Sequence, residues 1–222
     1  MLGAGRGKQG GVWLRYVCAL VACWVSPNAY AADGLFGMIE IKANSIRAIP
    51  KWVDVLGRIE AEQGRYQACL KNEEACSSSA MRRWSAFVAE QQGQPAREQM
   101  EATHRFLNTW TYITDSELWG KSDYWETPRE FVDNSGDCED YAIAKYVTLK
   151  ALGWPASRLR VAVVQDTVRD IPHAILITSL NDTHWVLDNL ALMPLPDRDV
   201  MQYKPYYAVN ETNRWVFVDP LN

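Results

Sequence analysis

Three residues in the second half of the sequence could act together in thiol chemistry: Cys138, His173 and Asp188. A thiolate attacks a carbonyl carbon, an imidazole takes the thiol proton, and a carboxylate fixes the tautomer of that imidazole. Their spacing would allow one helix followed by an antiparallel hairpin to bring all three side chains to one point. The chain therefore contains the residue types that a cysteine enzyme requires, in a workable order.

Cys138 is expected in the first turn of a helix. The preceding Ser135-Gly136-Asp137 is typical of a turn, and apolar residues then recur at helical spacing from Tyr141 onward. The positive end of the helix dipole favours a thiolate at this position. The alternative is a buried structural cysteine, which is the commonest role of a lone thiol, but the polar neighbours of Cys138 argue against it.

A predicted hairpin would place His173 beside Asp188. Three segments have the composition of strands: residues 159–165, 173–180 and 184–189. Asn181-Asp182 is typical of the turn between the last two strands. With that turn, His173 and Asp188 lie opposite each other or one diagonal step apart on the same face, whereas a slip of one residue would separate them. Either residue taken alone could equally be a structural residue of its strand.

The acidic neighbours of the thiol, Asp137, Glu139 and Asp140, create a difficulty, because negative charges raise the pKa of a nearby thiol. A hard cation with oxygen ligands would neutralise them, and three carboxylates within four residues suit calcium better than magnesium. The alternative is that acids in a first helical turn are favoured by the dipole without any metal. The segment is not an EF-hand loop, since the twelfth position counted from Asp133 is Ala144 and not Glu.

The first 31 residues are expected to be a secretory signal peptide. Basic residues precede a short apolar run over residues 16–25, and Ala29-Tyr30-Ala31 supplies the small residues of a cleavage site. A lipoprotein signal is the alternative, because Leu20-Val21-Ala22-Cys23 resembles a lipoprotein cleavage box. The apolar run is too short to span a bilayer. The sequence therefore predicts an exported protein of residues 32–222 without direct membrane insertion.

The charge of the remaining chain excludes some classes of partner. Residues 1–31 contain three of the 23 Lys and Arg and none of the 27 Asp and Glu, so the formal charge moves from −4 to −7 when they are removed. A mildly acidic protein lacks the electrostatic footprint for nucleic acid or for an anionic membrane surface. Its length suits one domain with a full core.

The cysteine count singles out one thiol. Without the first 31 residues, three of the five cysteines remain: Cys69, Cys76 and Cys138. Cys69 and Cys76 bracket a short loop, and in an oxidising compartment they are expected to form a disulfide. Cys138 is then the free thiol.

The part of the chain before residue 100 is expected to be helical. Apolar residues recur at helical spacing at Ile46, Ile49, Val53 and Leu56, and a second amphipathic run covers residues 81–89. We therefore expect a helical lobe over residues 32–99 and a lobe with the active helix and sheet over residues 100–222, with substrate lying across the seam between them. Residues 203–209 and 215–218 are expected to form a terminal hairpin that extends the sheet.

Several motifs resemble the bacterial transglutaminase-like cysteine peptidases of the LapG type. The resemblance covers most of the chain after residue 31. It rests on Tyr124–Phe131, Gly136–Ala142, His173–Leu176 and Val186–Asn189, and the upstream Leu107-Asn108 and Tyr112-Ile113-Thr114-Asp115 are also similar to that family. The Asp-Cys-Glu-Asp-Tyr core, with His and Asp at these distances, is more specific than a bare Cys, His, Asp order.

This resemblance implies a papain-like, transglutaminase-related α+β fold. Carried over to the matching positions, it assigns the triad to Cys138, His173 and Asp188. It also implies calcium bound by acids next to the nucleophile, which correspond here to the three carboxylates named above.

The resemblance further implies a periplasmic location and two partners. In that family, the substrate is a large surface adhesin, which is cleaved near its N-terminus so that cells leave a biofilm. An inner-membrane receptor for cyclic di-GMP holds the peptidase through its periplasmic domain. Two other functions stay open from the sequence: a transglutaminase-type acyltransferase, and a non-catalytic calcium-dependent binding module.

Overall fold

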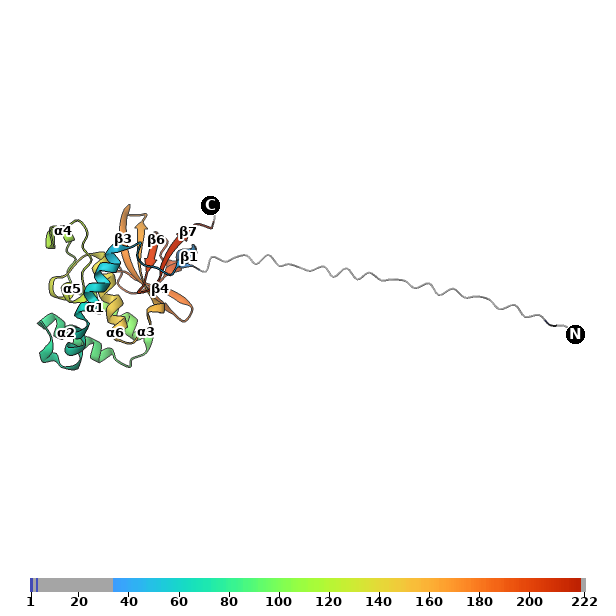
Figure 1. Cartoon of the computed structure of the whole chain (residues 1–222). Coiled ribbons are helices and arrows are strands. Elements are labelled where there is room, and N and C mark those ends of the chain that lie inside the picture. The colour runs from blue at the N-terminus through green and yellow to red at the C-terminus, as the bar shows by residue number, and fades with distance from the viewer. Residues whose placement is uncertain (2, 4–33, 221–222) are drawn as a thin grey trace. The chain divides into compact units, whose positions relative to one another are not determined.

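The computed structural model describes residues 1, 3 and 34–220. The chain divides into two units, Met1–Ala31 and Ala32–Asn222, and the helices and strands described below belong to the second (Figure 1). The predicted signal peptide lies almost entirely outside the described residues. Within them, no helix has both the length and the apolar character needed to cross a bilayer.

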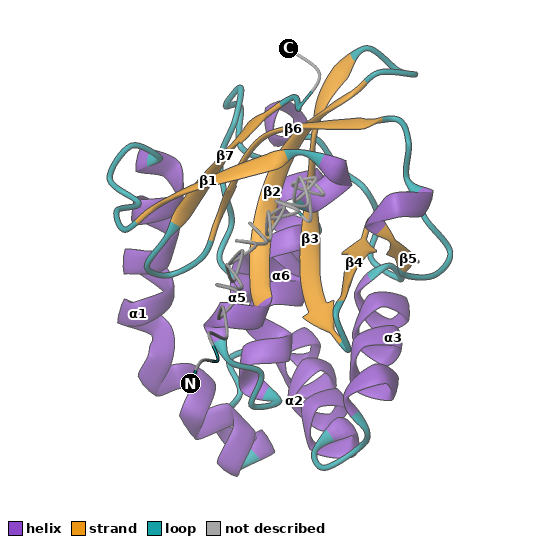
Figure 2. Cartoon of the chain, turned by 90° about the vertical axis from the view of Figure 1, so that its right-hand side faces the viewer, coloured by secondary structure: helices purple, strands orange, loops and turns teal. Residues whose placement is uncertain are grey.

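The second unit is built on a seven-stranded antiparallel sheet with the order β1-β7-β6-β2-β3-β4-β5. The strands are β1 (Ile39–Ala43), β2 (Leu159–Asp166), β3 (Ile171–Leu180), β4 (Thr183–Leu187), β5 (Leu195–Pro196), β6 (Tyr203–Val209) and β7 (Arg214–Val218). The α-helices are α1 (Pro50–Lys71), α2 (Ser79–Gln91), α3 (Ala96–Leu107), α4 (Asp115–Leu118), α5 (Pro128–Asn134) and α6 (Cys138–Ala151). Short 3₁₀ turns occupy Leu35–Gly37, Glu73–Ala75, Ala156–Arg158 and Asp197–Asp199. The larger helices gather on one side of the sheet, and α6 lies behind β2 and β3 (Figure 2).

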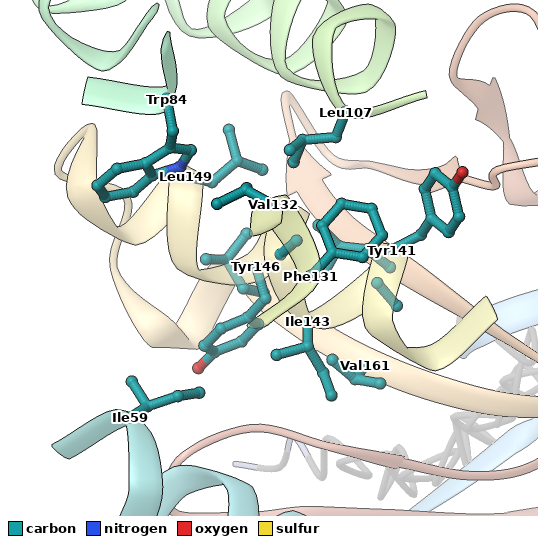
Figure 3. Packing of buried hydrophobic residues seen from close by; sticks show 14 of the residues in the cluster. Ile59, Trp84, Leu107, Phe131, Val132, Tyr141, Ile143, Tyr146, Leu149 and Val161 are labelled. Atoms are coloured by element: carbon teal, nitrogen blue, oxygen red, sulfur yellow. The ribbon is translucent and has the colours of Figure 1, made fainter. Parts of the chain in front are cut away.

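Helix α6 is the centre of the hydrophobic core. Side chains from α1, α2, α3, α5 and β2 surround its apolar residues (Figure 3). Ten of its fourteen residues are buried, so the helix is enclosed on nearly every side and is not packed along a single stripe. The sequence pattern identified one apolar face beginning at Tyr141, which is only part of this surface. The element that carries Cys138 is thus held by most of the domain.

The β3–β4 hairpin has the register that the sequence predicted. Leu180 pairs with Thr183 across Asn181-Asp182, and both turn residues have positive φ, at 51° and 56°. Positive φ at both central positions is the geometry of a type I′ turn, whose twist matches that of the flanking strands. Continuing this register places His173 one diagonal step from Asp188, beyond the last paired residue of β4.

The predicted start of the first helix was wrong, and its predicted apolar face was only partly right, since Leu56 packs against the core but Val53 does not. Helix α1 begins at Pro50, so Ile46 and Ile49 lie before it, and Val53 is exposed. A proline at the first helical position disfavours helical backbone in the residue before it. The buried face instead includes Trp52, whose indole N–H donates to the Asn210 carbonyl at 2.8 Å.

The division into lobes is less clean than the sequence suggested. Residues 39–43 form strand β1, which pairs antiparallel with β7 at one end of the sheet. The expected boundary near residue 99 falls inside α3. The start of the chain after residue 31 therefore contributes to the sheet as well as to the helices.

Cys69 and Cys76 are joined by a disulfide in the structure. It links the end of α1 to the segment before α2, and both cysteines are buried. Ser85, in the middle of α2, donates to the Cys69 carbonyl at 3.0 Å. The cross-link therefore lies where α1 and α2 pack together.

Replacing both Cys69 and Cys76 with serine should lower the free energy of unfolding by about 2 kcal/mol, because the cross-link restricts the unfolded chain over a short loop. Denaturant unfolding followed by circular dichroism measures this difference. A reductant should reproduce the loss in the wild type and leave the double variant unchanged. Equal unfolding free energies for the two oxidised proteins would contradict the expectation.

Candidate active site

Cys138 is the first residue of α6, as its sequence context predicted. Asp137 caps the helix in an extended conformation, and its N–H donates to Asp140 Oδ2 at 3.0 Å. A Cβ at Gly136 would collide with the Asp140 side chain, so the approach of the chain to this turn requires glycine. The Gly-Asp-Cys-Glu-Asp sequence is therefore a compact helix start that fixes the position of the thiol.

His173 and Asp188 form a buried pair. His173 Nε2 lies 2.8 Å from Asp188 Oδ1, and that oxygen also accepts the Leu190 N–H at 3.0 Å. Burial opposes ionisation, but the hydrogen bond and charge of His173 hold the pKa of Asp188 below its ordinary value. An ionised Asp188 requires Nε2 to carry the proton, which leaves Nδ1 of His173 available for proton transfer.

Cys138 and His173 line the same cavity, of about 390 Å³. Its wall comes from the residues at the start of α1, from Trp125, and from the sheet residues Val163 and Tyr207. Ala174, next to His173, lies close enough for its amide to interact with the Cys138 sulfur. The structure thus places Cys138 and His173 at one cavity between α1, α6 and the sheet, and Asp188 joins them through its hydrogen bond with His173.

The environment of Cys138 opposes formation of the thiolate. Burial raises the pKa of the thiol, and the charges of Glu139 and Asp137 raise it further, while the Ala174 amide acts in the opposite direction. The thiol itself donates to Glu139 Oε2 at 3.2 Å. The helix dipole that the sequence suggested as an activator is therefore outweighed by burial and by neighbouring carboxylates.

The structure adds two carboxylates to the acidic cluster that the sequence identified. Oxygens of Asp115, Asp123 and Glu139 lie within 4.8 Å of one another, and so do oxygens of Asp115, Asp137 and Asp140. Asp115 and Asp123 precede Cys138 by more than 14 residues, so local spacing could not reveal them. For Asp115 the sequence signal was the family-like stretch Tyr112-Ile113-Thr114-Asp115, and in the structure Thr114 and Glu117 form a capping box that places Asp115 at the start of α4.

The donor set of this cluster fits a hard cation. Asp115 Oδ1, Glu126 Oε2 and Asp137 Oδ1 are buried and have no hydrogen-bond partner among the described residues. Burial raises the pKa of Glu126 to about 8, and burial together with Asp137 raises that of Glu139 to about 8. Asp115 and Asp137 belong to the cluster, and carboxylates with unpaired oxygens are the ligands that calcium prefers.

The loop that carries Trp125 is fixed by Arg58 of α1. The guanidinium donates to Glu130 Oε2 at 2.7 Å and to the Trp125 carbonyl, and it stacks on the Tyr124 ring at 4.7 Å. Thr127 and Glu130 form a capping box at the start of α5. One wall of the cavity is therefore held by an ion pair between the first helix and the segment before the nucleophile.

The other two histidines have structural contacts outside the cavity. His104 is fully buried, with Nε2 3.0 Å from the Ala191 carbonyl, and burial and Lys145 lower its pKa to about 4. His184 pairs through Nδ1 with Ser179 Oγ at 3.0 Å. Among the three histidines, His173 is the one placed to act on Cys138.

Comparison with known proteins identifies the family. The family model of the bacterial transglutaminase-like cysteine proteinases matches residues 57–221. The chain belongs to this family. The membership confirms the resemblance seen in the sequence motifs, and it makes the chain a transglutaminase-like cysteine peptidase with an α+β fold.

Solved structures of a transglutaminase-like proteinase agree with this assignment. LapG from Legionella pneumophila is 29% identical to the chain, with a TM-score of 0.60 over 68% of this chain and 87% of that chain. Its calcium-bound form matches with the same values. An EGTA-treated form is 27% identical, with a TM-score of 0.60 over 70% of this chain and 90% of that chain. No curated protein sequence matches the chain.

In chelator, Glu126→Gln should raise the stability of this cysteine peptidase at pH 8 by on the order of 2 kcal/mol. The folded protein raises the pKa of Glu126 from 4.5 to about 8, so it binds this proton more tightly than the unfolded chain does. The stability of the wild type should therefore fall as the pH rises between these two values, and the variant should escape that fall.

Thermal unfolding of both proteins at pH 5 and pH 8 measures the effect. The gain of the Glu126→Gln variant should shrink toward pH 5, where the wild-type carboxyl is protonated. The exposed Glu60→Gln on α1 serves as the control and should show no such pH-dependent gain. A variant that is no more stable than the wild type at pH 8 would contradict the burial argument.

Proposed function

We propose that this chain is a calcium-dependent cysteine endopeptidase in which Cys138 is the nucleophile, His173 the general base and Asp188 the residue that orients His173. The observation that carries the proposal is the His173–Asp188 pair at 2.8 Å beside a cavity that Cys138 also lines. A buried carboxylate and an imidazole in this arrangement are what a thiol nucleophile needs.

The reaction follows from the positions of these groups. His173 Nδ1 takes the thiol proton, and the sulfur of Cys138 adds to the scissile carbonyl carbon. When the C–N bond breaks, the imidazolium returns its proton to the leaving amine, and a thioester on Cys138 remains. Water, deprotonated by His173, then attacks the thioester and releases the second product with a free thiol.

The developing negative charge on the carbonyl oxygen needs hydrogen-bond donors. The Cys138 amide is suited to this role, because N–H groups at the start of a helix lack intrahelical partners and point toward negative charge. Asp188 remains ionised and stabilises the imidazolium in both halves of the reaction, as the His173 hydrogen bond and the lowered pKa of Asp188 favour.

Calcium is proposed for the acidic cluster beside the thiol. Its ligands would come from three segments: Asp115, Asp123, and Asp137 with Glu139 and Asp140. A bound cation supplies positive charge that offsets these carboxylates. The calcium-bound and EGTA-treated LapG structures support this proposal, together with the unpaired buried oxygens of Asp115 and Asp137.

The substrate, partner and location are proposed from the family resemblance. We propose cleavage of the N-terminal region of a large surface adhesin, which would release the adhesin and promote biofilm dispersal. Control would come from the periplasmic domain of an inner-membrane cyclic di-GMP receptor. This places the mature chain, residues 32–222, in the periplasm after removal of the signal peptide.

Cleavage of a recombinant adhesin N-terminal fragment by the mature protein tests the proposal. We expect cleavage with calcium, and a loss of at least about 1,000-fold in chelator, in Cys138→Ala and in His173→Ala, since removing a triad member leaves little of the rate enhancement. His184→Ala is the matched histidine control and should cleave at the wild-type rate. Product masses from the digest locate the cleaved bond.

Other outcomes would point elsewhere. A Cys138→Ala protein that still cleaves would overturn the peptidase assignment to this thiol. Cleavage that survives the chelator would keep the triad and remove calcium. Incorporation of an added amine without net cleavage would select an acyltransferase, which forms the same thioester and resolves it differently.

A further inference from the structure

Tyr203 contacts both members of the His173–Asp188 pair, although it lies on β6 and outside every motif that the sequence analysis identified. Its hydroxyl donates to Asp188 Oδ2. Its ring lies 5.7 Å from the His173 ring, centroid to centroid. The residue is buried, at 4% exposure, and Phe36 packs against it in an edge-on arrangement.

The two oxygens of Asp188 have separate partners. Oδ1 lies 2.8 Å from His173 Nε2 and accepts the Leu190 N–H at 3.0 Å. Among the described residues, the partner of Oδ2 is the Tyr203 hydroxyl. A carboxylate held at one oxygen alone can rotate about its χ2 torsion, which is broad for aspartate. The Tyr203 hydroxyl removes that freedom by fixing the second oxygen.

A second cavity, of about 300 Å³, lies beside Tyr203 and Asp188. Both residues line this cavity, and Val168, Leu190 and Leu195 contribute apolar surface to it. Without the hydroxyl, water from this cavity could reach Oδ2 and compete for the carboxylate. The Tyr203 hydrogen bond therefore fixes Asp188 where solvent would otherwise bind.

We propose that Tyr203 is a positioning residue of the active site, whose hydroxyl holds the Asp188 carboxylate in the orientation that keeps the proton on His173 Nε2. With that proton held, Nδ1 stays free to receive the proton of Cys138. The inference rests on the proposed peptidase function. It adds a fourth residue to that site, which positions the groups that transfer the proton. It predicts a defect in the chemical step and not in substrate binding.

Titratable groups from α6, from α3 and from the end of β2 lie near Asp188 and Tyr203. Lys145 of α6 is fully buried and donates to the Leu187 carbonyl at 3.3 Å, one residue before Asp188. His104 of α3 interacts electrostatically with Asp188 and with Lys145, and its lowered pKa of about 4 keeps it neutral near pH 7. Asp166 at the end of β2 forms an ion pair with Arg169 at 2.7 Å, and both act on Tyr203 through their charges. These groups remain in place in the variants below, so the comparison isolates the hydroxyl.

The test compares Tyr203→Phe with Tyr206→Phe in the calcium-loaded mature protein. Tyr206 is a matched control, because it lies on the same strand and donates its hydroxyl to Gln165 Oε1 at 2.5 Å in an exposed position. With the adhesin fragment as substrate, Tyr203→Phe should lower kcat by about tenfold to about a hundredfold, as expected for a lost hydrogen bond to a charged group, and leave KM unchanged. Tyr206→Phe should change neither value.

Two further measurements separate positioning from a structural role. In a double-mutant cycle, Tyr203→Phe should add little to the defect of Asp188→Asn, because both changes act on one unit. In the inactive Cys138→Ala background, ¹⁵N NMR should show His173 protonated at Nε2, and Tyr203→Phe should convert this state into a mixture of tautomers.

The inference would be overturned by an unchanged kcat in Tyr203→Phe, by additive effects in the cycle, or by a kcat loss fully explained by a smaller active fraction in thiol titration. If the wild type cleaves nothing, the peptidase proposal fails. The tautomer measurement would still test the role of Tyr203, because it needs no turnover.

Discussion

The properties of the candidate site depend on how closely carboxylates gather around the first turn of α6. Gly136 allows the Asp140 side chain to close the turn, and this same closeness places the carboxylates of Asp137 and Glu139 beside the Cys138 thiol. Burial raises the pKa of the thiol and of Glu139 together. These surroundings oppose the thiolate, and a cation bound by the same carboxylates would offset their charge, which would link thiol reactivity to cation binding.

The remaining elements bring the other groups to that point. The central position of α6 fixes Cys138 through the whole core, and the type I′ turn of the β3–β4 hairpin fixes the spacing of His173 and Asp188. Lys145, buried on the same helix, donates to the Leu187 carbonyl at 3.3 Å. One hydrogen bond thus ties α6 to the end of β4, directly before Asp188.

Local signals in the sequence were sufficient for the elements that position Cys138, His173 and Asp188. The turn before Cys138 and the Asn181-Asp182 dipeptide act over a few residues, so helix start and hairpin register could be predicted. The buried face of α1 could not, because it depends on partners such as Asn210, which is distant in sequence from Trp52. Apolar periodicity alone selected exposed Val53.

The same limit applies to the site. Asp115 and Asp123 join the acidic cluster only through the packing of the segment before α5, and Tyr203 reaches Asp188 from β6, across the sheet from β4. The motifs near Asp115 and Asp123 do not assign these two residues to the cluster, and Tyr203 lies in a segment that the sequence predicted only as part of a hairpin. Residue type and spacing therefore revealed the reactive groups, and the fold was needed to show the groups that support them.

The central claim is that the thiol becomes reactive when a cation offsets the carboxylates around it. The most direct test is the rate of Cys138 alkylation by iodoacetamide as a function of free calcium, followed by mass spectrometry of the mature protein. Among the described residues Cys138 is the free cysteine, so the mass gain reports on this thiol. The account predicts slow alkylation in chelator and a saturable increase with calcium; a rate that is independent of calcium would contradict it.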